Sequence, residues 1–70
     1  MQYLLVPFPE QRVVIIDGIE QGMTNEVLEL EEGTHTATLK GPSDFDPEMR
    51  EFILRRTSEL NPKEIRFEKI

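Results

Sequence analysis

The residues of this chain that could carry chemistry are few, and the first to weigh is its single histidine, His35. It stands in an alternating segment where Ala37 and Leu39 share its face. A metal site or an acid–base pair needs a second polar group, and these two neighbours offer none. We expect His35 to close the edge of the core with a hydrogen bond to the backbone, and a pH-sensitive role is the alternative.

Three acidic residues, Asp44, Asp46 and Glu48, alternate in a stretch with the composition of a loop. Alternating carboxylates are typical of calcium loops, but an EF-hand loop needs about five or six oxygen positions and a glycine at the sixth. No glycine follows Gly41 in this chain. We therefore assign these acids to turns and caps, and expect neither a metal nor a cofactor.

The only cluster of basic residues consists of Arg50, Arg55 and Arg56. Glu48 and Glu51 are close by in the sequence, so cross-strand ion pairs are the first expectation. A site for a phosphate or a carboxylate group is the alternative, because arginine binds such groups through paired hydrogen bonds.

Nothing in the sequence predicts catalysis. Ser43 and Ser58 lack the Gly-x-Ser-x-Gly context of a nucleophile elbow, and the chain has no cysteine. A domain of 70 residues also leaves little room for a concave pocket of several hundred Å³. We expect a protein that is not an enzyme.

Length and charge narrow the class further. The 70 residues suffice for one domain, which we place at residues 1–70, and the net charge of −6 disfavours nucleic acid and anionic membranes as partners. Residues 1–12 lack the basic and apolar regions of a signal peptide, since Pro7 and Pro9 interrupt the apolar run. These features favour a cytoplasmic protein.

The elements that must position these side chains are short strands. Residues 12–41 hold four apolar segments, at 12–17, 19–23, 27–30 and 34–40, separated by turn-forming residues. Asp17-Gly18 predicts a type I′ hairpin turn. Leu28 and Leu30 alternate with glutamates, and three threonines alternate with His35, which indicates strands with one dry face and one wet face.

Val13 to Ile16 is the strongest strand of the sequence, because all four residues are β-branched. Four consecutive apolar residues predict burial on both faces. Tyr3 to Val6 reads as an edge strand that ends at Pro7, and Phe8 either caps the core or projects as an exposed anchor. Of these two alternatives for Phe8 we favour the cap.

The segment at residues 46–60 admits two interpretations. Asp46-Pro47 resembles a helix start, and apolar residues follow at helical spacing. Phe52-Ile53-Leu54 also suits a strand, with residues 58–62 as the following turn, and we favour the strand. Ile65 and Phe67 then share one face of a last strand at residues 63–70.

Several turn and core positions follow a pattern: Asp17-Gly18, Gly22 with Thr24, Leu28-x-Leu30, Gly33-x-His35 ending in Leu39, and Gly41 with Phe45. In this pattern the chain resembles the PEGA domain, a small β-sandwich module of bacterial and archaeal proteins. The resemblance covers most of residues 12–70 and implies fold more than chemistry. The resemblance also implies an accessory part of a larger, often surface-exposed protein.

These observations together predict an all-β fold, a small two-layer antiparallel sandwich of about seven short strands, with a helix near residues 46–60 as the alternative. The expected function is a non-catalytic binding or structural module that contacts another protein or a second copy of itself. The predicted contact residues are Tyr3, Leu5, Phe8, Arg50, Arg55 and Arg56. The edge strand at Tyr3 to Val6 predicts a homodimer. A small carbohydrate-binding or anion-binding domain, using residues 41–48 and the arginines, is the alternative function.

Overall fold

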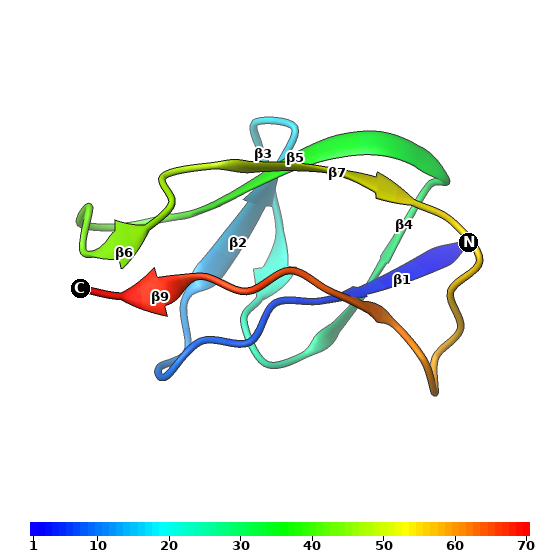
Figure 1. The fold of residues 1–70 in the computed structure, drawn as a ribbon, viewed down its shortest axis with the longest axis horizontal. Coiled ribbons are helices and arrows are strands. Elements are labelled where there is room, and N and C mark those ends of the chain that lie inside the picture. The colour runs from blue at the N-terminus through cyan, green and yellow to red at the C-terminus, as the bar shows by residue number, and fades with distance from the viewer.

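The structure is a computed structural model that describes residues 1–70. It contains nine short strands and no helix (Figure 1). The strands are β1 (Gln2–Leu5), β2 (Val13–Ile16), β3 (Ile19–Met23), β4 (Val27–Leu30), β5 (Gly33–Leu39), β6 (Phe45–Asp46), β7 (Arg50–Leu54), β8 (Lys63–Glu64) and β9 (Glu68–Lys69).

The strands form two main sheets and a short ribbon. One sheet has the order β3-β2-β5-β7, the other has the order β4-β1-β8, and β6 pairs with β9 in the ribbon. In Figure 1, β5 and β7 cross the top of the molecule while β1 and the C-terminal segment run below them. The prediction of a small, sandwich-like all-β fold is confirmed.

The alternation of residue types explains which face of each strand is buried. Leu28 and Leu30 of β4 are buried and Glu29 between them is exposed. Apolar residues recur at every second position because successive side chains of a strand point to opposite faces. In β5, Ala37 and Leu39 point inward, and the threonines lie on the more exposed face. Both patterns were predicted from the sequence.

The β2–β3 hairpin has the predicted tight turn. Asp17 and Gly18 both have positive φ, 53° and 83°, as a type I′ turn requires. Further along, Val14 pairs with Gly22 and Ile15 pairs with Glu20, which leaves Gln21 as the extra residue of a β-bulge. A Cβ at Gly22 would lie 2.4 Å from Leu28 Cδ2, so any larger residue here would force the buried Leu28 side chain to move.

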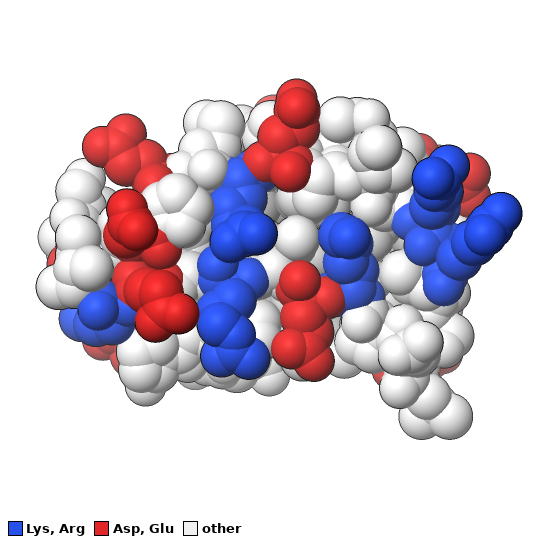
Figure 2. Space-filling model, in the orientation of Figure 1, with Lys and Arg blue, Asp and Glu red and all other residues white.

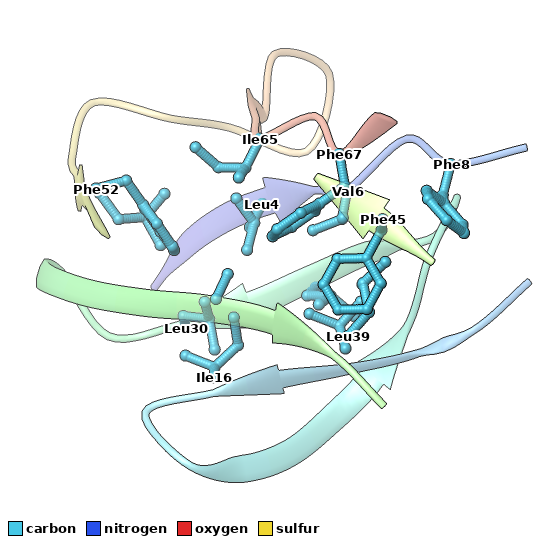
Figure 3. Close-up of a cluster of buried hydrophobic side chains, with 14 residues drawn as sticks. Leu4, Val6, Phe8, Ile16, Leu30, Leu39, Phe45, Phe52, Ile65 and Phe67 are labelled. Carbon is cyan, nitrogen blue, oxygen red and sulfur yellow. The ribbon is translucent and has the colours of Figure 1, made fainter. Parts of the chain in front are cut away.

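One apolar core lies between the sheets (Figure 3). Phe45 and Phe67 meet edge to face with their ring centres 5.6 Å apart, and so attach the β6–β9 ribbon to this core. The buried apolar residues are Leu4, Val6, Phe8, Val14, Ile16, Leu28, Leu30, Ala37, Leu39, Phe45, Phe52, Leu54, Ile65 and Phe67.

The irregular segment between β1 and β2 is held by Thr24 and Asn25. The Asn25 side chain accepts a hydrogen bond from the Phe8 N–H at 3.0 Å and donates one to the Phe8 carbonyl at 2.9 Å. The fully buried Thr24 hydroxyl accepts from the Arg12 N–H at 2.8 Å and donates to the Glu10 carbonyl at 2.9 Å. These four bonds replace a strand ladder along a segment that Pro7 and Pro9 interrupt.

The structure differs from the predicted strands in four details. The first strand is not an edge, because β4 pairs with it on one side and β8 lies parallel to it on the other, with Leu4 opposite Lys63. β2 is not buried on both faces, since Val13 and Ile15 are only half-buried on the open outer side of the sheet. The strands number nine, and the β1–β8 pair departs from the expected antiparallel arrangement.

The alternative of a helix at residues 46–60 is also wrong. β7 pairs with β5, and its inward residues Phe52 and Leu54 fill the core. Apolar residues at helical spacing, such as Met49 and Leu60, are exposed instead. Pairing with β5 satisfies the backbone of this segment and buries its alternate residues, which outweighs the helix-start signal at Asp46-Pro47.

Candidate functional site

The residues predicted to contact a partner do not form one site. Tyr3 and Leu5 are half-buried and alternate with the inward residues of β1, so they lie on the outer face of the β4-β1-β8 sheet. Phe8 is buried in the core, which confirms the core cap and rules out the exposed anchor. The three arginines lie in and after β7, in the other sheet.

The arginines do not make the expected ion pairs with Glu48 and Glu51. Arg50 donates a hydrogen bond to the Arg66 carbonyl at 3.2 Å. Arg55 and Arg56 are exposed and belong to none of the ion pairs of the structure. Figure 2 shows basic side chains gathered at the end of the molecule where β7 ends. The guanidinium groups of Arg55 and Arg56 are therefore open to an external anion, such as a carboxylate.

The backbone of β7 is open along one side. β7 lies at the edge of its sheet and pairs only with β5, where Thr36 stands opposite Glu51. The Thr36 backbone faces away from β7, because its N–H donates to Asp17 Oδ1 at 2.9 Å and its carbonyl accepts the Asp17 N–H at 3.0 Å.

Hydrogen-bonded and non-bonded pairs alternate along an antiparallel ladder. Thr36 and Glu51 are thus a non-bonded pair, and the bonds to β5 come from Phe52 and its alternate neighbours. The N–H and carbonyl groups of Glu51 and Ile53 consequently point outward, and no hydrogen bond outside the ladders uses them.

The side chains beside this open backbone are free as well. Ile53 is 53% exposed, although it sits in the middle of a strand. Glu51 is exposed and belongs to no ion pair of the structure. Glu51, Ile53 and Arg55 alternate along the chain and so project from the same, outer face of the sheet. We call these three residues and their outward backbone groups the β7 edge.

Asp44, one of the acids that suggested a calcium loop, belongs to a cluster of ion pairs. Asp44 pairs with Arg12 at 2.5 Å and with Lys69 at 2.6 Å, and Glu10 contacts both cations. The hydrogen bond from Arg12, and then that from Lys69, hold the pKa of Asp44 far below its usual value. No group of acids and histidine is arranged to hold a metal ion. The ion pairs among Glu10, Arg12, Asp44 and Lys69 instead link the β6–β9 ribbon to the start of β2.

His35 has the backbone hydrogen bond that was expected and a polar partner that was not. Its Nε2 lies 2.7 Å from the Glu31 carbonyl oxygen, and its Nδ1 lies 2.6 Å from Asp17 Oδ2. Both oxygens can only accept, so the geometry suits an imidazolium that donates from both nitrogens. The Asp17 hydrogen bond, followed by that to Glu31, raises the pKa of His35, and the pKa of Asp17 is lowered in return.

The surface has three hollows, and none assembles reactive groups. The largest, about 450 Å³, lies beside Phe8, Phe67 and Lys69. Lys69 is already neutralised there by Glu10 and Asp44, and its ammonium stands 6.0 Å from the centre of the Phe8 ring. The hollow next to His35 measures about 300 Å³, but both ring nitrogens are engaged. The β7 edge is therefore the candidate functional site.

Sequence reasoning missed both the open edge and the Asp17–His35 pair. The signal for the edge was present in the alternation of Glu51, Ile53 and Arg55, which the competing helix interpretation obscured. Asp17 was read as a turn residue only, because the contact with His35 spans 18 residues of sequence.

None of the structure's elements is a helix that is long and apolar enough to cross a membrane. No protein family, curated protein or solved structure matches the chain. The resemblance to the PEGA domain stays a prediction that depends on the turn and core residues alone.

Proposed function

We propose that this protein is a non-catalytic binding module that contacts another protein by accepting an extended strand at the β7 edge. The observation that carries the proposal is the outward backbone of Glu51 and Ile53, in a strand that has only one neighbour. An unpaired edge of this kind is a template for β-strand addition, in which main-chain hydrogen bonds supply affinity and side chains supply specificity.

Two further features of the β7 edge support this function. Ile53 offers an exposed apolar contact within the strand, whereas edge strands of monomers often carry charge or proline there. Glu51 and Arg55 lie on either side of it with opposite charges and no partner within the chain. A bound strand that places a cation opposite Glu51 and an anion opposite Arg55 would be recognised in one direction and register.

Selection from a displayed library of random peptides, with the domain as bait, tests the proposal. We expect the selected peptides to shift the NMR amide signals of Glu51 and Ile53. Replacement of Ile53 by proline removes the outward N–H but spares the ladder to β5, so it should weaken binding at least about tenfold. Ile53→Ala is the matched control, since it shortens the same side chain and keeps the N–H. Peptides that bind elsewhere and tolerate Ile53→Pro would contradict this function.

The second candidate function is anion binding by Arg55 and Arg56, and the lack of any internal ion pair to them favours it. Arg56 has a φ of 58°, so the extended conformation ends there, and both arginines are exposed just after the end of β7. Titration with inorganic phosphate distinguishes this function. If the domain binds anions, phosphate should shift the NMR amide signals of residues 55–57 and leave that of Ile53 unchanged.

A further inference from the structure

The charge pattern of the β7 edge identifies its partner. We propose that the strand added at β7 is β7 of a second copy of this chain, related by a two-fold axis that passes between the two Ile53 residues. This inference rests on the proposed function, because it needs an edge that accepts a strand. It replaces the dimer expected at Tyr3 to Val6, whose two sides are already paired.

The register follows from the direction of the backbone groups. Outward groups belong to Glu51 and Ile53, so hydrogen-bonded pairs between two copies must join odd-numbered residues to odd-numbered residues. Centring the pair on Ile53 sets Ile53 opposite its own copy and Glu51 opposite Arg55 of the second copy. By symmetry the same charge pair forms twice.

The side chains of both faces match in this register. On the outer face two exposed isoleucines meet between two glutamate–arginine pairs, so apolar surface is buried and opposite charges are adjacent. On the inner face Phe52 stands opposite Leu54 of the second copy, which places core residue beside core residue. The ladder ends after Arg55, because Arg56 has a φ of 58° and leaves the extended conformation.

Shifting the register by two residues loses this match. A pair centred on Phe52 would set Glu51 opposite Ile53 of the second copy, so each carboxylate would face an apolar side chain. Arg55 would then have no carboxylate opposite it. The sequence of β7 therefore selects one register over its nearest competitor.

The other edges of the molecule do not offer the same match. The β3 edge is distorted by the bulge at Gln21. The β4 edge carries Glu26, Glu29, Glu31 and Glu32 and no basic residue, so two copies would bring like charges together. β8 and the ribbon strands are only two residues long. Of all the edges, only β7 is regular and self-complementary.

Sedimentation equilibrium of the full chain tests the inference. Because contact through one strand buries less surface than a standard interface, we expect a dimer with a Kd on the order of 100 µM. Glu51→Arg sets arginine opposite arginine, and Arg55→Glu sets glutamate opposite glutamate, so each variant should be monomeric. An equimolar mixture of the two variants restores opposite charges at both positions and should form a heterodimer. The double variant should form a homodimer.

Glu59→Arg and Arg56→Glu are the matched controls. They make the same changes of charge at exposed positions outside the ladder, and they should dimerise like the parent. Circular dichroism of every variant checks that the fold is kept. If the Glu51→Arg variant dimerises as well as the parent, the proposed register is wrong. It is also wrong if the mixture of Glu51→Arg and Arg55→Glu stays monomeric while both controls dimerise.

The result also separates this inference from the function on which it rests. If the parent is monomeric at about 1 mM while selected peptides still bind β7 and are lost in Ile53→Pro, the self-pairing is wrong and the module binds a different protein. If neither peptides nor a second copy bind β7, both proposals are wrong. A dimer that is sensitive to Glu51→Arg and rescued by the mixture supports both.

Discussion

Single polar side chains determine how the irregular parts of this small fold are held. Thr24 is fully buried, yet its hydroxyl accepts a hydrogen bond from the Arg12 N–H and donates one to the Glu10 carbonyl. No side-chain polar atom in the structure is buried without a partner. Each such group is thus a point where one substitution leaves its partners unsatisfied.

Thr24→Val tests this dependence. Valine has nearly the shape of threonine but neither accepts from the Arg12 N–H nor donates to the Glu10 carbonyl. We expect the free energy of unfolding to fall by about 1–3 kcal/mol, measured by urea denaturation. Thr34→Val on the exposed face of β5 is the control and should change stability little. Equal effects of the two substitutions would contradict a specific role for Thr24.

The Asp17–His35 pair predicts how stability depends on pH. The pKa of His35 is raised in the folded state, so its contribution is complete below the usual pKa of about 6.5 and is lost as the pH rises through the folded value. The pKa of Asp17 is lowered, so its contribution is lost only as the pH falls through that depressed value. The pair therefore stabilises the fold most in mildly acidic solution.

Urea denaturation at about pH 5.5 and about pH 9 measures this effect. The parent should be less stable at the higher pH, and His35→Gln should remove this difference. Asp17→Asn keeps a residue suited to the turn but removes the charge, so it should reduce the difference as well. A parent with the same pH dependence as His35→Gln would show that the pair does not couple protonation to folding.

At the scale of elements, much of the fold could be predicted from the sequence because its signals are local. The β2–β3 turn needs positive φ at Asp17 and Gly18, and the alternation in β4 and β5 defines one dry face. The pairing of β1 with β8 could not be predicted, since β8 has two residues and returns from the far end of the chain. Burial of Val13 and Ile15 was overestimated because nothing in the sequence tells whether a sheet has a covered outer face.

The candidate site was predicted only in part. Of the β7 edge, only Arg55 was chosen as a contact residue. Ile53 was not chosen, because its exposure depends on β7 being the last strand of the sheet. Strand order is a property of the whole chain, whereas residue periodicity is local.

Hydrogen exchange tests the open side of β7 directly. At concentrations well below the Kd of the proposed dimer, the amides of Phe52 and Leu54 should exchange slowly because they bond to β5. The amides of Glu51 and Ile53 should exchange faster, at least about tenfold, and should slow as the protein concentration rises. Uniform protection along β7 would contradict the assigned direction of its backbone groups.

For the molecule as a whole, charges of both signs are spread over the surface. Basic and acidic side chains alternate in bands across the face shown in Figure 2, with no broad area of one sign. The net charge of −6 opposes the approach of two copies, but salt screens exposed charges beyond about 8–10 Å. In the proposed dimer, short-range complementarity at the β7 edge would then decide which surfaces meet.

The extra residue in β3 has a consequence for how large an assembly can grow. A sheet with two regular edges can join head to tail and extend into a filament, whereas one usable edge closes at a pair. Because Gln21 deforms the edge opposite β7, the proposed pairing would end at two chains. Deletion of Gln21 should straighten β3 and produce fibres, detectable by light scattering and electron microscopy, while Gln21→Ala should not. If the β7 dimer forms, the bulge at Gln21 would protect the protein from unlimited polymerisation.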